Sequence, residues 1–219
     1  MEAILFYLVP VFCGIAFLAS LNIYFHPPVE LYFRIFSFYL LYDCISQTYG
    51  DYQALHHQNT ILYSDLTTMV SSCFYIYLMR VIIRSPKAKR ILLYCLVAFP
   101  LISAINIFLV QKSGAFQTMT YSLGCLIIVG ACIYYFWELF QSKNYINLAR
   151  EPTFWICSGL LFYYTCLFPV YGFINYISRD RAVIQVILVV LDFVGILLYL
   201  SFTIAFLCRL KTRKSMLSS

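Results

Sequence analysis

Charged residues are scarce in this chain, since Asp, Glu, Lys and Arg together make up only 11% of its 219 residues. Soluble domains carry roughly 25% charged residues, because their surfaces must be hydrated. With 63% hydrophobic residues, a soluble fold of this size would lack the polar surface needed to cover its apolar side chains. The composition therefore excludes an ordinary soluble domain and indicates a protein whose solvent is lipid.

Motifs of catalysis and cofactor binding are also missing. The chain has no HExxH pair, no CxxC pair and no Gly-x-Gly-Asp motif, and its last apolar run contains no Lys that could carry retinal. Its nine cysteines lie within or at the edges of apolar runs, where they are expected to be small, reduced core residues. His56 and His57 are adjacent, which makes chelation of one ion by both unfavourable. The sequence predicts no enzyme, no cofactor, no metal site and no nucleic-acid partner.

Long apolar runs dominate what is present. Runs of about 20 apolar residues match the thickness of a bilayer at helical rise, and their continuity argues against the alternating strands of a membrane barrel. The sequence predicts one all-α domain over residues 1–219, a bundle of seven transmembrane helices without a cleavable signal peptide. The predicted spans are about 3–24, 31–49, 61–83, 91–110, 116–140, 152–177 and 182–208. Small residues such as Gly124 and Gly130 are expected to mark close helix contacts.

The basic residues predict the orientation. Twelve of the fifteen Lys and Arg residues would lie at one membrane face if the N-terminus were outside, and only Lys112, Arg179 and Arg181 would lie at the other. Basic residues concentrate on the cytoplasmic side of membrane proteins. We therefore expect the N-terminus outside and the C-terminus inside, with the chain in the inner membrane of a bacterium. The lipid bilayer is its first partner, and topology accounts for the net charge of +6.

Polar residues inside the spans gather at one predicted depth. In the second span, Tyr39, Asp43 and Gln47 recur at helical spacing, and the third span begins with Ser64 and Asp65. Ser103 and Asn106 of the fourth span and Thr120 and Tyr121 of the fifth fall in the same layer. The sequence predicts an outward-opening, acidic, Tyr-rich cavity. Its candidate ligand-binding residues are Asp43, Asp192, Gln47, Tyr39, Asp65, Tyr171, Asn175 and Gln185.

Asp43 and Asp192 carry most of this prediction. An ionised Asp facing lipid at mid-depth costs at least roughly 2.5 kcal/mol on insertion scales, and no Lys or Arg lies at that depth to pair with it. Tyr hydroxyls and amides are the expected partners, and the site suits a proton, a metal cation or an amine-bearing ligand. Two plainer interpretations remain. Asp65 can be an interfacial acid near a helix start, and each Ser or Thr can simply pack between helices.

The fifth and sixth spans resemble a known group. Thr120-Tyr121-Ser122-Leu123-Gly124, then Tyr134-Tyr135-Phe136-Trp137-Glu138-Leu139, and then the segment from Glu151 to Tyr164 (EPTFWICSGLLFYY) resemble small seven-helix membrane proteins of Bacteroidetes-type bacteria. Similar modules precede histidine kinase domains. The resemblance implies a membrane sensor that works with a histidine kinase or another signalling protein in trans, and it loosely matches Asp43 to an acid of the second span in that group.

Three functions follow from these observations. The leading hypothesis is a non-enzymatic membrane sensor or signalling module, in which a ligand in the outer cavity shifts the helices. The second is a small transporter or ion-coupled carrier that binds a cation or proton at Asp43 and Asp192. The third is an assembly or scaffold protein without a ligand. A cavity that is closed on the inner side favours the sensor, whereas a continuous polar path favours the carrier.

Overall fold

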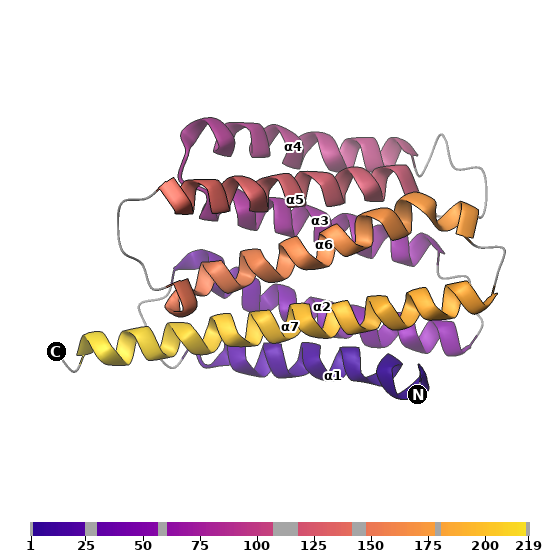
Figure 1. The fold of residues 1–219 in the computed structure, drawn as a ribbon, viewed down its shortest axis with the longest axis horizontal. Coiled ribbons are helices and arrows are strands. Elements are labelled where there is room, and N and C mark those ends of the chain that lie inside the picture. Colours follow the sequence, from indigo (N-terminus) through magenta and orange to yellow (C-terminus); the bar gives the residue numbers. More distant parts are fainter. Residues whose placement is uncertain are drawn as a thin grey trace.

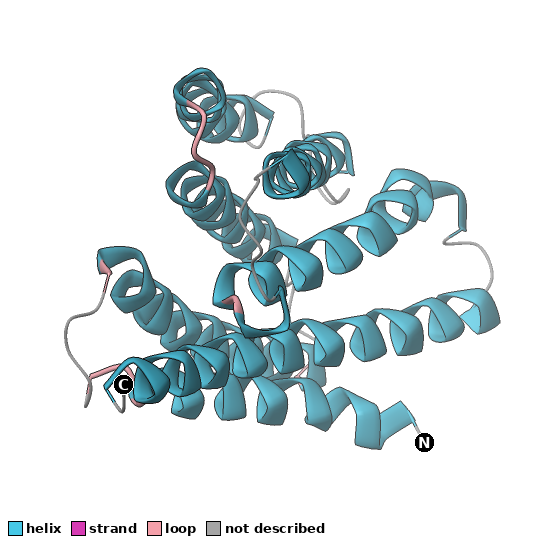
Figure 2. Cartoon of the chain, turned by 60° about the vertical axis from the view of Figure 1, so that its left-hand side comes forward, coloured by secondary structure: helices cyan, strands magenta, loops and turns pink. Residues whose placement is uncertain are grey.

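The computed structural model describes residues 2–24, 30–56, 61–106, 118–141, 148–177 and 181–217. Within these ranges the chain is helical and contains no strand, which confirms the all-α prediction (Figure 2). The helices are α1 (Glu2–Leu21), α2 (Leu31–Leu55), α3 (Ile61–Ile82), α4 (Pro86–Ile105), α5 (Thr118–Gln141), α6 (Pro152–Ile177) and α7 (Arg181–Leu217), with a short 3-10 helix η2 (Leu148–Arg150) before α6.

Three helix boundaries differ clearly from the prediction, and the largest difference is at the end of α7, which continues to Leu217 where the predicted span ended at 208. Residues 50–55 were predicted as part of a polar loop, but they continue α2. Gly50 and Asp51 of this part line a cavity. The fourth helix begins five residues earlier than predicted, at Pro86, directly after its N-cap Ser85. Proline suits the first turn of a helix, because the backbone N–H that proline lacks would have no hydrogen-bond partner within the helix there.

Four helical segments are long and apolar enough to cross a membrane, namely Pro86–Ile105, Met119–Gln141, Pro152–Tyr171 and Gln185–Arg209. Over the described residues, α1, α2 and α3 do not reach this standard, although α2 has 25 residues and α3 has 22. The polar side chains that α2 and α3 direct into the cavity lower their hydropathy. Large apolar side chains such as Phe38, Tyr94 and Phe140 are mostly exposed on the outside of the bundle, as expected for surfaces that contact lipid.

The helices run side by side along the long axis of the molecule, and the two termini lie at opposite ends (Figure 1). The helix α7 packs against α1 and α6, α6 packs against α5, and α3 packs against α4 and α5. One end of this bundle, which we call the cavity end, holds the start of α1, the end of α2 and the start of α3. The other, the basic end, holds the start of α4, the start of α6 and the last part of α7.

Aromatic rings fill the middle of the bundle. The ring of Phe36 on α2 packs on Phe202 of α7 with centroids 4.9 Å apart, and Tyr39 stacks on Phe74 of α3 at 3.8 Å. Phe36 and Phe202 are completely buried. This layer binds α2, α3 and α7 together and separates the two ends.

Two predicted small-residue contacts have different outcomes. A Cβ atom on Gly124 would lie 3.1 Å from the ring of Phe99 and 3.2 Å from Ser72 Oγ, so α5 approaches α4 and α3 closely there. At Gly130 the prediction is wrong, because that residue is exposed and a Cβ would meet nothing within 4 Å.

Candidate ligand-binding cavity

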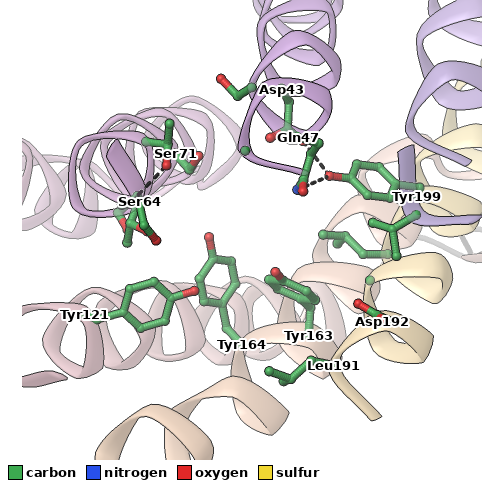
Figure 3. Close-up of a pocket in the computed structure, with 18 of the residues that line it drawn as sticks. Asp43, Gln47, Ser64, Ser71, Tyr121, Tyr163, Tyr164, Leu191, Asp192 and Tyr199 are labelled. Atoms are coloured by element: carbon green, nitrogen blue, oxygen red, sulfur yellow. Dashed lines mark hydrogen bonds between the residues drawn. The ribbon is translucent and has the colours of Figure 1, made fainter. Parts of the chain in front are cut away.

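A cavity of about 390 Å³ lies at the cavity end of the bundle. Residues of α2 and α3 form one side of it, and residues of α5, α6 and α7 form the other (Figure 3). Three carboxylates line it, from Asp43, Asp51 and Asp192. Eight tyrosines also line it, namely Tyr39, Tyr63, Tyr75, Tyr121, Tyr163, Tyr164, Tyr171 and Tyr199. Among the described residues, no Lys, Arg or His side chain faces this space, so its wall is acidic and aromatic.

Asp43 joins α2 to α7 through a tyrosine. The Tyr199 hydroxyl donates to Asp43 Oδ2 over 2.6 Å, and Gln47 Nε2 donates to the same hydroxyl over 3.3 Å (Figure 3). Asp43 is 8% exposed, and the Cys13 thiol of α1 lies 4.0 Å from Oδ2. A short hydrogen bond to a carboxylate is stronger than one between neutral groups, so this contact stabilises the packing of α2 on α7 deep in the cavity.

Asp51 of α2 and Asp192 of α7 place two further carboxylates on the cavity wall. Asp51 lies beyond the predicted second span. Burial, and secondly the charge of Asp192, raise the pKa of the Asp51 carboxyl to about 6. Like charges at close range disfavour ionisation of both groups. A bound cation would relieve this repulsion.

Aromatic rings close the deep side of the cavity. Tyr39 and Tyr75 line it with ring centroids 5.3 Å apart, and Tyr75 in turn packs edge-on against Tyr164 at 5.8 Å. The buried ring of Phe36 packs on Tyr39 at 6.4 Å, and that of Phe202 packs on Tyr75 at 6.3 Å. Over the described part of the chain, the cavity therefore ends at a packed aromatic floor.

The hydroxyl groups on the α3 side of the cavity fit the interpretation in which such groups only pack and bond within the protein. Thr67 Oγ1 donates to the carbonyl oxygen of Ser64 over 3.0 Å, within its own helix. The hydroxyl of Tyr63 donates to the carbonyl oxygen of Ser46 over 2.9 Å and ties α3 to α2. These groups are satisfied by backbone, so they position the wall without needing a ligand.

Five of the eight predicted site residues lie on this one cavity, namely Tyr39, Asp43, Gln47, Tyr171 and Asp192. Gln185 is a correction, since it is exposed near the start of α7, about one turn before the lining residue Leu188. Asp65 is a second correction. It is buried, at 7% exposure, but it does not line the cavity, because adjacent helical residues point about 100° apart and its neighbour Ser64 faces inward. The side chain of Asn175 lies outside the described part of the structure.

The predicted contribution of the fourth span is also wrong. Asn106 Nδ2 donates to Thr120 Oγ1 over 2.7 Å, which links the ends of α4 and α5 outside the cavity. Ser103 is buried and likewise does not line it. The sequence prediction placed these residues at a depth but could not place them around the bundle.

Most lining residues were absent from the predicted set, among them Asp51, Tyr163, Tyr164 and Tyr199. A signal for Asp51 was available, because it lies four residues after Gln47 and therefore on the same helical face. The prediction ended the second span too early to use it. Tyr163 and Tyr164 carry no such signal, since tyrosines occur throughout the chain.

The basic end holds its own acidic residues, which make internal bonds. Glu138 accepts the backbone N–H groups of Arg84 over 2.9 Å and of Ser85 over 2.8 Å. Its carboxylate thus binds the N-terminus of α4, where a negative charge is favourable. The hydroxyl of Tyr135 donates to Thr153 over 3.1 Å, and Thr153 donates to Glu151 over 3.3 Å.

No family model, no curated protein and no solved structure matches this chain. The resemblance of residues 120–164 to small bacterial seven-helix proteins therefore stays a prediction.

Proposed function

We propose that the chain is a multi-pass membrane protein with seven spans, its N-terminus outside and its C-terminus inside, that senses a small molecule. In this proposal the cavity opens to the outside of the inner membrane of a bacterium. The charge distribution supports the orientation, because Arg84, Lys87, Lys89 and Arg90 lie together at the basic end, which would then face the cytoplasm.

The single observation that carries the sensing proposal is the bond between Tyr199 and Asp43. It lies on the cavity wall and joins α2 to α7, and α7 continues from there to the basic end. A ligand that competes for either group weakens one contact between the two helices. A ligand shifts a conformational equilibrium when it binds one arrangement better than the other. Ligand binding in the cavity would thus change how the inner ends of α2 and α7 are arranged.

The aromatic floor supports a sensor over a carrier, because the rings of Tyr39, Phe36 and Phe202 pack on one another beneath the cavity. The receiving protein in this proposal is a histidine kinase or another signalling protein in trans, as the resemblance implies. The short loops and the final part of α7 at the basic end would make that contact.

A distance measurement between the inner ends of α2 and α7 tests the proposal. Spin labels carried by unnatural amino acids would replace Arg34 and Leu207, which are both exposed. In lipid nanodiscs, Tyr199→Phe should shift or broaden the distance distribution, because it removes the hydroxyl that binds Asp43. Tyr121→Phe is the matched control, since it removes another hydroxyl of the cavity wall without touching this bond. Identical distributions in the parent chain and in Tyr199→Phe would reject the coupling.

The proposed orientation has its own test. A C-terminal reporter enzyme that is active only outside the cytoplasmic membrane should stay silent on this chain. Strong activity of that reporter would refute the inside position of the C-terminus.

A carrier is the second candidate, and one observation favours it. A second cavity of about 320 Å³ lies at the basic end, lined by Glu30, Arg84, Glu138 and Glu151 among others. Two polar cavities on opposite sides of a closed layer also occur in alternating access. Uptake of a ligand into proteoliposomes, abolished by Asp43→Asn, would favour the carrier over the sensor.

A further inference from the structure

We propose that the ligand of this cavity is an organic ammonium ion with an apolar body, held by Asp51 and Asp192 and by the tyrosines of α5 and α6. This inference rests on the proposed ligand-sensing function and specifies its chemical class.

The charge of the wall selects a cation. Asp43, Asp51 and Asp192 line the same space, and none of the described lining residues is basic. Asp43 already accepts a hydrogen bond from Tyr199, whereas Asp51 and Asp192 act on one another as like charges. An ammonium group between these two carboxylates converts a repulsion into two charge-assisted hydrogen bonds. A cleft lined by one sign of charge also concentrates ions of the opposite sign.

The part of the wall formed by α5 and α6 favours a ligand with an apolar body. Tyr121 of α5 packs on Tyr171 of α6 with centroids 4.1 Å apart, and Tyr163 and Tyr164 continue this surface toward Asp192 (Figure 3). Tyrosine faces attract cations and pack on apolar groups. The volume of about 390 Å³ lies within the usual range of small-molecule sites.

A metal cation and a proton fit this cavity less well than an ammonium ion does. Among the described residues, no three His, Cys, Asp or Glu side chains come close enough together to hold a metal ion. Divalent calcium prefers six to eight oxygen ligands, and the described carboxylates do not form a cluster of three. A proton alone would need neither this volume nor an aromatic wall.

Calorimetric titration of the full chain in lipid nanodiscs tests the inference. The probes are butylamine, 2-phenylethylamine and tryptamine at neutral pH, with 2-phenylethanol as a neutral molecule of the same shape as the second. Because a hydrogen bond to a charged group contributes substantially more than a neutral one, 2-phenylethylamine should bind at least about tenfold more tightly than 2-phenylethanol. It should also bind more tightly than butylamine, which offers less apolar surface.

Substitutions locate the site. Asp192→Asn and Asp51→Asn should each weaken binding of 2-phenylethylamine by about tenfold or more, and Tyr163→Leu by a few-fold. Asp65→Asn is the matched control, because Asp65 is buried but does not line the cavity, and it should leave the affinity unchanged. Thermal unfolding of each variant confirms that it folds.

Two results would overturn the inference. One is that none of the three ammonium probes binds, or that the alcohol binds as tightly as the amine. The other is that Asp192→Asn and Asp51→Asn leave the affinity intact. Neither result touches the coupling of α2 to α7, which the spin-label distances test without a ligand, so failure of the ligand class and failure of the sensing proposal can be told apart.

Discussion

The two ends of the bundle use their acidic side chains in different ways. At the basic end, Glu138 accepts two backbone N–H groups within 2.9 Å, and Glu151 accepts the hydroxyl of Thr153. At the cavity end, Asp51 and Asp192 face an open space with no basic residue among its described lining. Glu138 and Glu151 of the basic end thus bond within the protein, whereas Asp51 and Asp192 of the cavity end line an open space. In the proposed function, the basic end contributes to stability and the cavity end binds the ligand.

The largest expected effect is on the free energy of unfolding, when one acidic side chain at each end is replaced. Glu138→Gln should lower the free energy of unfolding by about 2–3 kcal/mol, because it removes the charge that binds the N-terminus of α4. Asp192→Asn should be neutral or slightly stabilising, since it relieves the repulsion with Asp51 and functional sites often cost stability. Thermal and denaturant unfolding in detergent measure both. A larger loss in Asp192→Asn than in Glu138→Gln would contradict the assignment of the two ends.

The glycines sharpen the comparison at the helix interfaces. A Cβ on Gly159 of α6 would lie 2.8 Å from Ser201 Cβ of α7, toward the basic end. Gly159→Ala should therefore cost about 1–3 kcal/mol by overpacking. Gly195 is the matched control beside the cavity, because its Cβ would meet Val9 at an ordinary 3.7 Å. Gly195→Ala should be neutral or stabilise by up to about 1 kcal/mol. Equal losses at both positions in unfolding experiments would show that the two regions are packed alike.

A smaller effect concerns pH at the cavity end. With the pKa of Asp51 raised to about 6, this carboxyl is charged above that pH and neutral below it. The affinity for 2-phenylethylamine should be constant from about pH 8 to 7 and should fall several-fold as the pH decreases through 6. Because bound cation favours the charged carboxylate, the midpoint in the complex should lie lower than in the free protein. In Asp51→Asn this step should shrink, and an unchanged step would assign the titration to another group.

The sequence was sufficient for the number and approximate position of the helices, because continuous apolar runs leave few alternatives. It also predicted that Asp43 and Asp192 line a cavity, because a carboxylate in an apolar helix is energetically costly unless it faces polar groups or water. It could not assign Asn106, Asp65 or Gln185, because the direction of each side chain depends on how the helix is rotated in the bundle. That rotation is set by packing of many rings, such as Tyr39 on Phe74, which no local pattern encodes.

The central proposal is that the cavity end opens to the outside while the basic end faces the cytoplasm. Cysteine introduced at Ser64, on the cavity wall, or at Ser85, at the N-cap of α4, can be tested with a membrane-impermeant maleimide on intact spheroplasts. The unsubstituted chain corrects for labelling of the nine native cysteines. We predict labelling of Ser64→Cys in intact cells, slowed by 2-phenylethylamine, and labelling of Ser85→Cys only after permeabilisation. The reverse pattern would contradict the account.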